Sequence, residues 1–125
     1  MGVTVTGLDP VVASLEQVEV RLIANLRKAV QVTCGKVKES ARSRITGYKH
    51  LPAYPYSITY DTKYLGLSVE GEIGPDKSRK QGPLGNIVEF GTSNNAPIPH
   101  LGPALDENVD DFLRGVEIAV EQATQ

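Results

Sequence analysis

Few residues in the sequence are of the kinds that perform chemistry, and they are widely separated. The chain has one cysteine, Cys34, and two histidines, His50 and His100, which lie far apart in the sequence. A metal site needs several cysteine, histidine or carboxylate ligands at tight spacing, so no metal ligand is predicted. A buried packing residue is the usual role for a lone cysteine within a helical segment. One cysteine also excludes a disulfide within the chain.

The carboxylates and the glycine-rich segments do not predict a catalytic site either. Glu70 and Glu72 share one face of a predicted strand, where a solvated polar face is the ordinary interpretation. The run Gly82-Pro83-Leu84-Gly85 lacks the glycine spacing and the Lys-Ser/Thr of a phosphate-binding loop. Residue order alone gives no Ser–His–Asp arrangement. We therefore expect no catalytic residue, no cofactor and no enzymatic activity.

Basic residues are the most suggestive charged groups. The predicted long helix carries Arg21, Arg27, Lys28, Lys36, Lys38, Arg42 and Arg44, and a later loop carries Lys77, Arg79 and Lys80. A solvated helix face is the ordinary interpretation. The alternative is a patch that meets an acidic partner or DNA. A net charge of −2 shows that the whole molecule is not a basic nucleic-acid binder. A small nucleic-acid-binding α+β module with a basic helix face remains the alternative function.

The length and composition predict one globular domain over residues 1–125. Hydrophobic residues make up 40% of the chain and charged residues 22%, a composition typical of a soluble globular domain. No apolar run approaches the roughly 18–20 residues that span a bilayer, so we expect no membrane contact.

The apolar spacing in the first half predicts a short strand followed by a long helix. Residues 3–6 alternate branched and polar side chains, as in a strand. Asp9-Pro10 then provides a helix start, and apolar residues recur every three or four positions through 11–44. Gly35 is the weak point of this helix, and a bend near Cys34 and Gly35 is expected.

The second half predicts three strands and a final helix. Segments 56–61 and 67–73 alternate apolar and polar residues and should form a hairpin, and a third strand is expected at 86–90. The segment 74–85 joins the second and third of these strands and is expected to be a mobile basic loop. The last helix is expected at 103–122, with an apolar stripe of Leu105, Val109, Phe112, Val116, Ala119 and Ala123. The predicted fold is α+β, with a long N-terminal helix and a C-terminal helix packed on a small antiparallel sheet in the order β-α-β-β-β-α.

Four segments resemble a known family in the same order along nearly the whole chain. They are V-T-V-T-G-L-D, S-I-T-Y, I-V-E-F-G-T-S and A-P-I-P-H-L-G-P-A-L. Together they resemble the small head–tail connector, or tail-completion (neck), proteins of long-tailed bacteriophages. The most specific part is 88–92 followed by 99–105. The family often has a Pro-x-Asp-Thr-Gly-like run where the long helix ends, and Ile45-Thr46-Gly47-Tyr48 matches it only in part.

The resemblance implies a structural virion protein of the head–tail joint, without a catalytic step. Such a subunit forms a ring with copies of itself, for which a hexamer is favoured and a dodecamer is the alternative. Its other partners would be neighbouring head-completion (stopper) and tail-terminator or tail-tube proteins, with genomic DNA passing through unbound. It would reside in the virion neck, and in the host bacterial cytoplasm before assembly.

The long irregular connection at 91–103 fits such a ring, because a ring subunit presents different surfaces to its two neighbours. Pro97 and Pro99 stiffen the chain, so less entropy is lost when it docks. Arg79 and Lys80 could face acidic groups of a neighbour, such as Glu89 or the cluster 106–111. The predicted contact residues are Arg79, Lys80, Glu89, Phe90, Asn94, Asn95, Pro97, Pro99, His100 and Leu101. The alternative is that 94–103 is a loop wrapping its own core.

Overall fold

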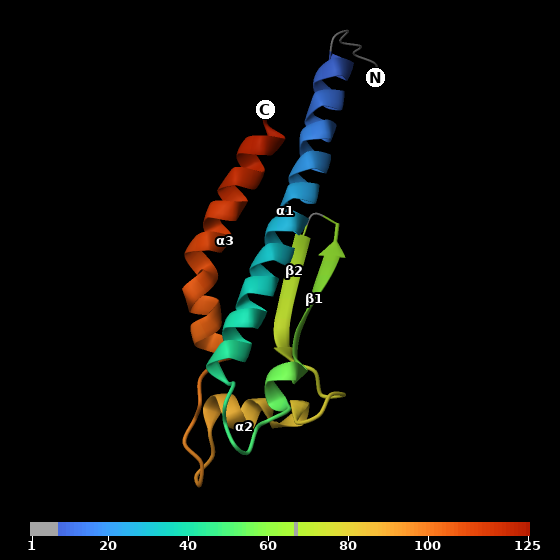
Figure 1. Cartoon of the computed structure of the whole chain (residues 1–125). Helices are drawn as coiled ribbons and strands as arrows, with labels where there is room; N and C mark the ends of the chain where they lie inside the picture. Colours follow the sequence, from blue (N-terminus) through green and yellow to red (C-terminus); the bar gives the residue numbers. More distant parts are fainter. Residues whose placement is uncertain (1–7, 67) are drawn as a thin grey trace.

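A computed structural model describes residues 8–66 and 68–125 and has the predicted α+β class. The long helix α1 forms the middle of the molecule, with the antiparallel hairpin on one side and α3 on the other (Figure 1). Short helices close one end, which we call the basal end (Figure 1). The elements are α1 Leu8–Arg44, η1 Tyr54–Ser57, β1 Ile58–Leu65, β2 Ser68–Pro75, η2 Gly82–Leu84, α2 Gly85–Phe90 and α3 Leu101–Ala123.

α1 is one helix of 37 residues, about 55 Å long. It starts at Leu8, so Asp9 and Pro10 lie in its first turn, where proline is tolerated. The helix continues through Cys34 and Gly35 without a break, because the turns on both sides pack against other elements. The strand predicted at 3–6 lies outside the described residues.

The hairpin is confirmed, and one of its faces covers α1. Ile58 pairs with Pro75 and Tyr60 with Ile73, so apolar side chains of both strands share a face. On this face Gly71 lies directly on Cys34, and a side chain at Gly71 would collide with the cysteine sulfur. The sheet can therefore approach the helix closely only with a glycine at this position.

The third predicted strand is wrong, because residues 85–90 form the short helix α2. The amide of Gly91 donates to the carbonyl oxygen of Ile87 at 2.8 Å, which is a helical bond. Residues 86–90 include three apolar side chains, and so short a segment fits a strand and a buried helical turn equally well, so its spacing does not decide between them. In the part of the chain that the structure describes, the sheet has two strands.

The last helix is confirmed, but its apolar stripe is only partly buried. α3 packs on α1 through small residues: a side-chain carbon on Gly115 would lie 3.6 Å from Ala29. Ala104, Ala119 and Ala123 are buried on the same side. Leu105 is 50% exposed, because the small face brings the helices close and turns the larger side chains outward.

The main core lies near the basal end, where the last turns of α1 meet α2 and the start of α3. It is built from Val37, Ala41, Ile45, Tyr54, Ile58, Val88 and Ala104. This placement matters for function because it anchors both ends of the irregular connection between α2 and α3.

Candidate functional site

The start of α3 is capped by a side chain from another helix. His100 precedes the helix and provides no side-chain cap of its own. Instead Oε1 of Glu89, in α2, accepts hydrogen bonds from the amides of His100 at 2.9 Å and Leu101 at 2.7 Å. Oε2 of Glu89 lies 3.5 Å from the amide of Gly102, and the next residue, Pro103, has no N–H to satisfy. One carboxylate therefore serves the free amides at this helix start and opposes the positive end of the helix dipole.

His100 extends this cap into a buried polar cluster. Its Nδ1 lies 3.0 Å from Oε1 of Glu89 and 2.9 Å from the carbonyl oxygen of Ile98. Its Nε2 lies 2.7 Å from the hydroxyl of Tyr54, and the two rings meet edge to face. With the proton on Nδ1, the imidazole donates on one side and accepts from the Tyr54 hydroxyl on the other. The cluster ties α2, α3 and η1 together.

The charges of this cluster favour a structural role over a catalytic one. Burial acts to raise the pKa of Glu89. The hydrogen bonds from the backbone amides of Leu101 and His100, together with the electrostatic interaction with the His100 ring, outweigh burial and leave the pKa lowered. Burial, together with the charge of Glu89, raises the pKa of Tyr54 to about 12. Tyr54 and His100 are both 0% exposed. A Tyr–His–Glu chain of this kind keeps its hydroxyl protonated and out of reach, so it does not supply a nucleophile.

The loop 91–97 projects from this anchored point at the basal end (Figure 1). The amide of Ile98 donates to the carbonyl oxygen of Val88 at 2.8 Å and closes the base of the loop. At its tip, Thr92 and Asn95 exchange backbone bonds of 2.9 and 3.3 Å. Gly91 has a φ of 75°, and a side chain there would come within 2.7 Å of Asn95 and Pro97. The loop is thus exposed but internally bonded.

The segment 74–85 is more ordered than the mobile loop that the sequence predicts. β2 extends to Pro75, and η2 occupies the far end. Gln81 joins this segment to the connection between α1 and η1. Its Oε1 accepts hydrogen bonds from the backbone amides of Ala53 and Tyr54 at 2.8 and 3.0 Å, and its Nε2 donates to the backbone carbonyl oxygen of His50 at 2.9 Å. These bonds connect two stretches far apart in sequence, which is why composition alone indicated a free loop.

The ten predicted contact residues separate into three groups by burial. Glu89 and His100 are buried and bond to each other, so their side chains face the protein's own interior. Leu101 is half-buried against the core. The exposed members are Arg79, Lys80, Phe90, Asn94, Asn95, Pro97 and Pro99. The alternative of a loop that wraps its own core therefore describes Ile98, His100 and Leu101, whereas Pro99 and residues 92–97 are exposed.

Two members of the site escaped the sequence analysis, Tyr54 and Gln81. No local pattern reveals them, because their partners are more than 25 residues away. One signal was available for the cap itself. No Ser, Thr, Asp or Asn directly precedes α3, so a helix starting at Leu101 requires a cap from elsewhere.

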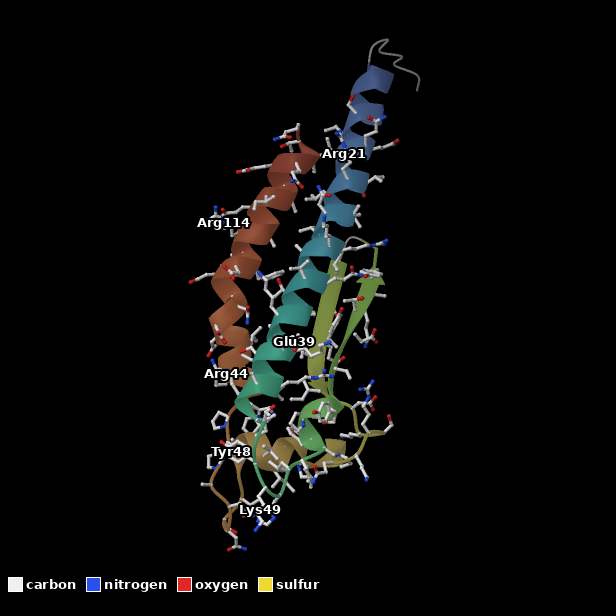
Figure 2. All side chains as sticks on the ribbon, in the orientation of Figure 1. Arg21, Glu39, Arg44, Tyr48, Lys49 and Arg114 are labelled. Carbon is white, nitrogen blue, oxygen red and sulfur yellow. The ribbon has the colours of Figure 1, made fainter. Side chains whose placement is uncertain are left out.

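Exposed apolar and basic side chains lie at the basal end on η1, on α2 and on the segments 47–50 and 76–81. Phe90 is 76% exposed and Tyr56 70% exposed. Arg79 donates to the carbonyl oxygen of Tyr56 at 3.0 Å, and its Nε lies 3.7 Å from Asp76. Figure 2 shows Tyr48 and Lys49 at this same end. We call this set the basal surface: Tyr48, Lys49, Tyr56, Lys77, Arg79, Lys80, Ile87 and Phe90.

The basic residues of α1 do not act as one face. On the hairpin side, the guanidinium of Arg27 lies 4.2 Å from the ring centre of Tyr64. Arg42 donates two hydrogen bonds to the backbone carbonyl oxygen of Ile58, at 2.7 and 3.0 Å. On the opposite side, Arg44 pairs with Glu107 at 3.0 Å. Lys38 lies over Tyr60 of the hairpin, whereas Arg21 and Lys36 contact residues 125 and 111 at the other side. These cations hold the layers together rather than form a patch.

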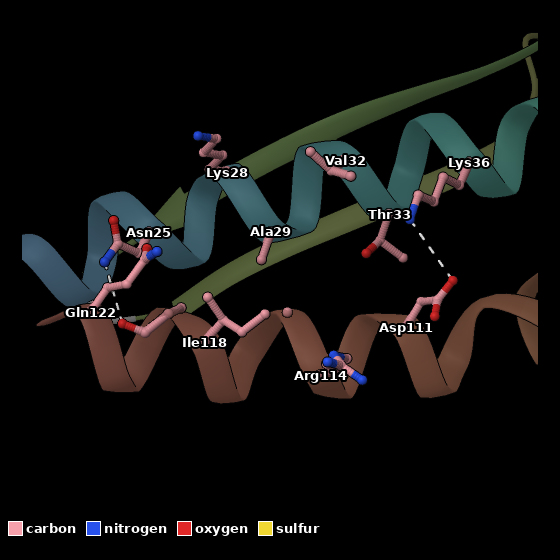
Figure 3. Close-up of a pocket in the computed structure, with 12 residues that line it drawn as sticks. Asn25, Lys28, Ala29, Val32, Thr33, Lys36, Asp111, Arg114, Ile118 and Gln122 are labelled. Atoms are coloured by element: carbon pink, nitrogen blue, oxygen red, sulfur yellow. Dashed lines mark hydrogen bonds and ion pairs between the residues drawn. The ribbon is translucent and has the colours of Figure 1, made fainter.

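A shallow groove of about 420 Å³ runs between α1 and α3 (Figure 3). Lys28, Lys36 and Arg114 lie along it, and Lys36 Nζ is 3.8 Å from Asp111. Its floor includes Ala29. Within residues 8–66 and 68–125, no three His, Cys, Asp or Glu side chains are grouped as a metal site would require. None of the described helices is long and apolar enough to cross a membrane.

Comparisons with known proteins add no relative: the chain matches no protein-family model, no curated protein and no solved structure.

Proposed function

We propose that this protein is a structural subunit of the neck of a long-tailed bacteriophage, acting as a ring that joins the tail to the DNA-filled head. One observation carries the proposal. The two most specific segments of the resemblance, 88–92 and 99–105, contact each other through Glu89 and His100. The glutamate of V-E-F-G-T caps the helix that begins within P-H-L-G-P. The two motifs therefore form one structural device, which supports reading them as a pair rather than as chance matches.

The geometry of the basal end suits a ring subunit. Neighbours in a ring make heterologous contacts, so each subunit needs two different surfaces. The loop 91–97 is internally bonded and contains Pro97, so docking it on a neighbour costs little conformational entropy. Phe90 and Ile87 are exposed beside it and find no place in their own core. Such residues are typical anchors of a protein–protein contact.

The charge of the molecule agrees with a channel through which DNA passes. A strongly basic lumen would retain DNA, because each neutralised phosphate adds affinity. A net charge of −2, with Lys36 and Arg44 of α1 paired to carboxylates of α3, is in keeping with weak retention. The proposed partners are further copies of this chain, head-completion or stopper proteins on one side, and tail-terminator or tail-tube proteins on the other.

Disruption of the gene in the phage or prophage that carries it tests the proposal. We expect induced cells to accumulate DNA-filled heads and free tails that do not join, and a plasmid copy of the gene should restore infectious particles. Cryo-electron microscopy of intact particles should place the protein at the head–tail joint. Normal particles without the protein, or purified virions that lack it, would overturn the proposal.

A further inference from the structure

The outer side of α3 carries an apolar stripe that nothing in the described part of the chain covers. Leu105, Val109 and Leu113 follow one another at four-residue spacing, and Val116 and Val120 continue the line. Leu113 is 54% exposed, and Leu105, Val109 and Val120 are also exposed. The stripe is about 22 Å long. It exists because α3 packs on α1 through its alanine and glycine face instead.

An acidic row runs beside this stripe. Asp106 and Asp110 are one turn apart, as are Glu117 and Glu121, and all four are exposed. Within the described residues none of them forms an ion pair, whereas Glu107 and Asp111 are already paired with Arg44 and Lys36. Two copies of α3 packed antiparallel through the same stripe would bring two acidic rows together. Like charges across an interface are unfavourable, so the acidic row favours a partner surface with basic residues.

The basal surface of the same chain has this complementary character. It combines exposed Tyr56, Ile87 and Phe90 with Lys49, Lys77, Arg79 and Lys80. Its acidic neighbours are few: Asp76 lies 3.7 Å from Arg79, and Glu89 is buried. The molecule thus has an apolar, basic end and an apolar, acidic side.

We infer that the stripe of α3 binds the basal surface of a second copy of this chain. The contact is heterologous, since one copy uses α3 and the other its basal end, and it leaves a free surface of each kind for the next copy. The apolar side chains supply the stabilising area, and the opposite charges select the partner surface and fix the register. This inference deepens the proposed function, and it rests on that function only for closure of the contact into a ring.

A charge-reversal pair tests the contact in purified protein. One variant combines Asp110→Lys with Glu117→Lys on α3, and the other combines Lys77→Glu with Lys80→Glu on the basal surface. Arg79 is left in place because it also bonds to Tyr56 within the chain. We expect each variant alone to weaken self-association, measured by sedimentation velocity, about tenfold or more, and the combination of both to recover it. The single variants should lose most at low salt, where repulsion is least screened.

Two further variants complete the test. Leu113→Ser should also weaken association, while circular dichroism stays unchanged because the side chain is exposed. The control is Glu70→Lys with Glu72→Lys, on the exposed outer face of the hairpin, which should associate like the wild type.

Four results would overturn the inference. They are a wild type that stays monomeric at about 100 µM, no recovery in the combined variant, stronger association of the α3 variant alone, and loss of duplex-DNA binding rather than of self-association in the Lys77/Lys80 variant. The third would indicate pairing of α3 with α3, and the fourth would assign the basal surface to nucleic acid. If association fails but gene disruption still separates heads from tails, the neck function stands and this contact is wrong.

Discussion

Glu89 is the residue on which the basal end depends. Its carboxylate is nearly buried, yet it accepts bonds from the backbone at the start of α3 and faces the ring of His100. A buried charge is tolerated only when it is this well satisfied. The same group therefore fixes where α3 begins and how the loop 91–97 leaves the fold.

Replacing Glu89 should lower the free energy of unfolding more than replacing any exposed acidic residue does. Glu89→Ala leaves the amides of His100 and Leu101 and the ring of His100 without their partner in a dry site. We expect a loss of about 3 kcal/mol in the free energy of unfolding, measured with urea. The matched control is Glu70→Ala on the outer hairpin face, which should change stability by less than about 0.5 kcal/mol. Equal losses in the two variants would contradict a capping role for Glu89.

The pH dependence of this loss follows from the lowered pKa of Glu89. The folded pKa lies below the ordinary value of about 4.3 in an unfolded chain, so the ionised carboxylate stabilises the fold above that pH. This contribution disappears as the pH falls through the folded pKa. Glu89→Gln keeps the shape but cannot ionise. Its deficit relative to the wild type should be large at pH 7 and should narrow as the pH falls below the ordinary pKa of a glutamate and through the lowered folded pKa. A deficit independent of pH would mean that packing, not charge, makes the difference.

At the scale of elements, α1 is the scaffold on which the hairpin and α3 are mounted. Gly35, in the part of α1 that packs on other elements, suggests a hinge when the sequence is taken alone, but the helix continues through it. No atom of another element lies within 4 Å of the position that a side-chain carbon would take there. Gly35→Ala should therefore stabilise the protein by about 0.5–1 kcal/mol, because alanine favours the helix and meets no obstacle.

Thermal unfolding of Gly35→Ala checks this expectation, and Gly71→Ala is its matched control. Gly71 lies on Cys34, so an added methyl group there should destabilise the fold. If Gly35→Ala lowers the melting temperature, α1 needs flexibility at this point.

The loop between α2 and α3 is the element whose stiffness should matter for assembly. Pro97 and Pro99 are exposed, so replacing both with alanine removes no core contact. We expect the circular dichroism of the purified protein to stay nearly unchanged while the yield of joined particles in a complementation assay falls, since a looser loop loses more entropy on docking. Pro52→Ala, an exposed proline outside the loop, should have little effect. Normal yield from the double variant would restrict the loop to packing within its own chain.

At the scale of the whole molecule, charge is separated although the net charge is small. Exposed cations of the basal surface lie at one end, and α3 carries carboxylates that form no ion pair within the described residues. A small chain with one apolar, basic end and one apolar, acidic side can be matched by a copy of itself in a head-to-side manner. Exposed ion pairs add only about 0–1 kcal/mol each, so the apolar residues supply the strength and the charges supply the direction.

The sequence by itself determined the long regular elements. A three-to-four residue spacing sustained over many turns admits only a helix, and two alternating segments around a short turn admit a hairpin. These signals are local and repeated many times, so α1, α3 and the two strands could be predicted with small shifts in their ends. The sequence also marked Glu89 and His100 as important, but as contacts for a neighbour.

Only the tertiary structure decided the rest. The five residues before Gly91 became a helix rather than a strand because Val88 reaches the core in that form. α3 turned its small face inward because Ala29 and Gly115 allow close approach. Glu89 met His100 and Tyr54 only after α2, α3 and η1 had been brought together. Periodicity records which residues share a face, but it does not record which surface will meet that face. That choice is made by shape, burial and hydrogen bonding between segments far apart in the chain.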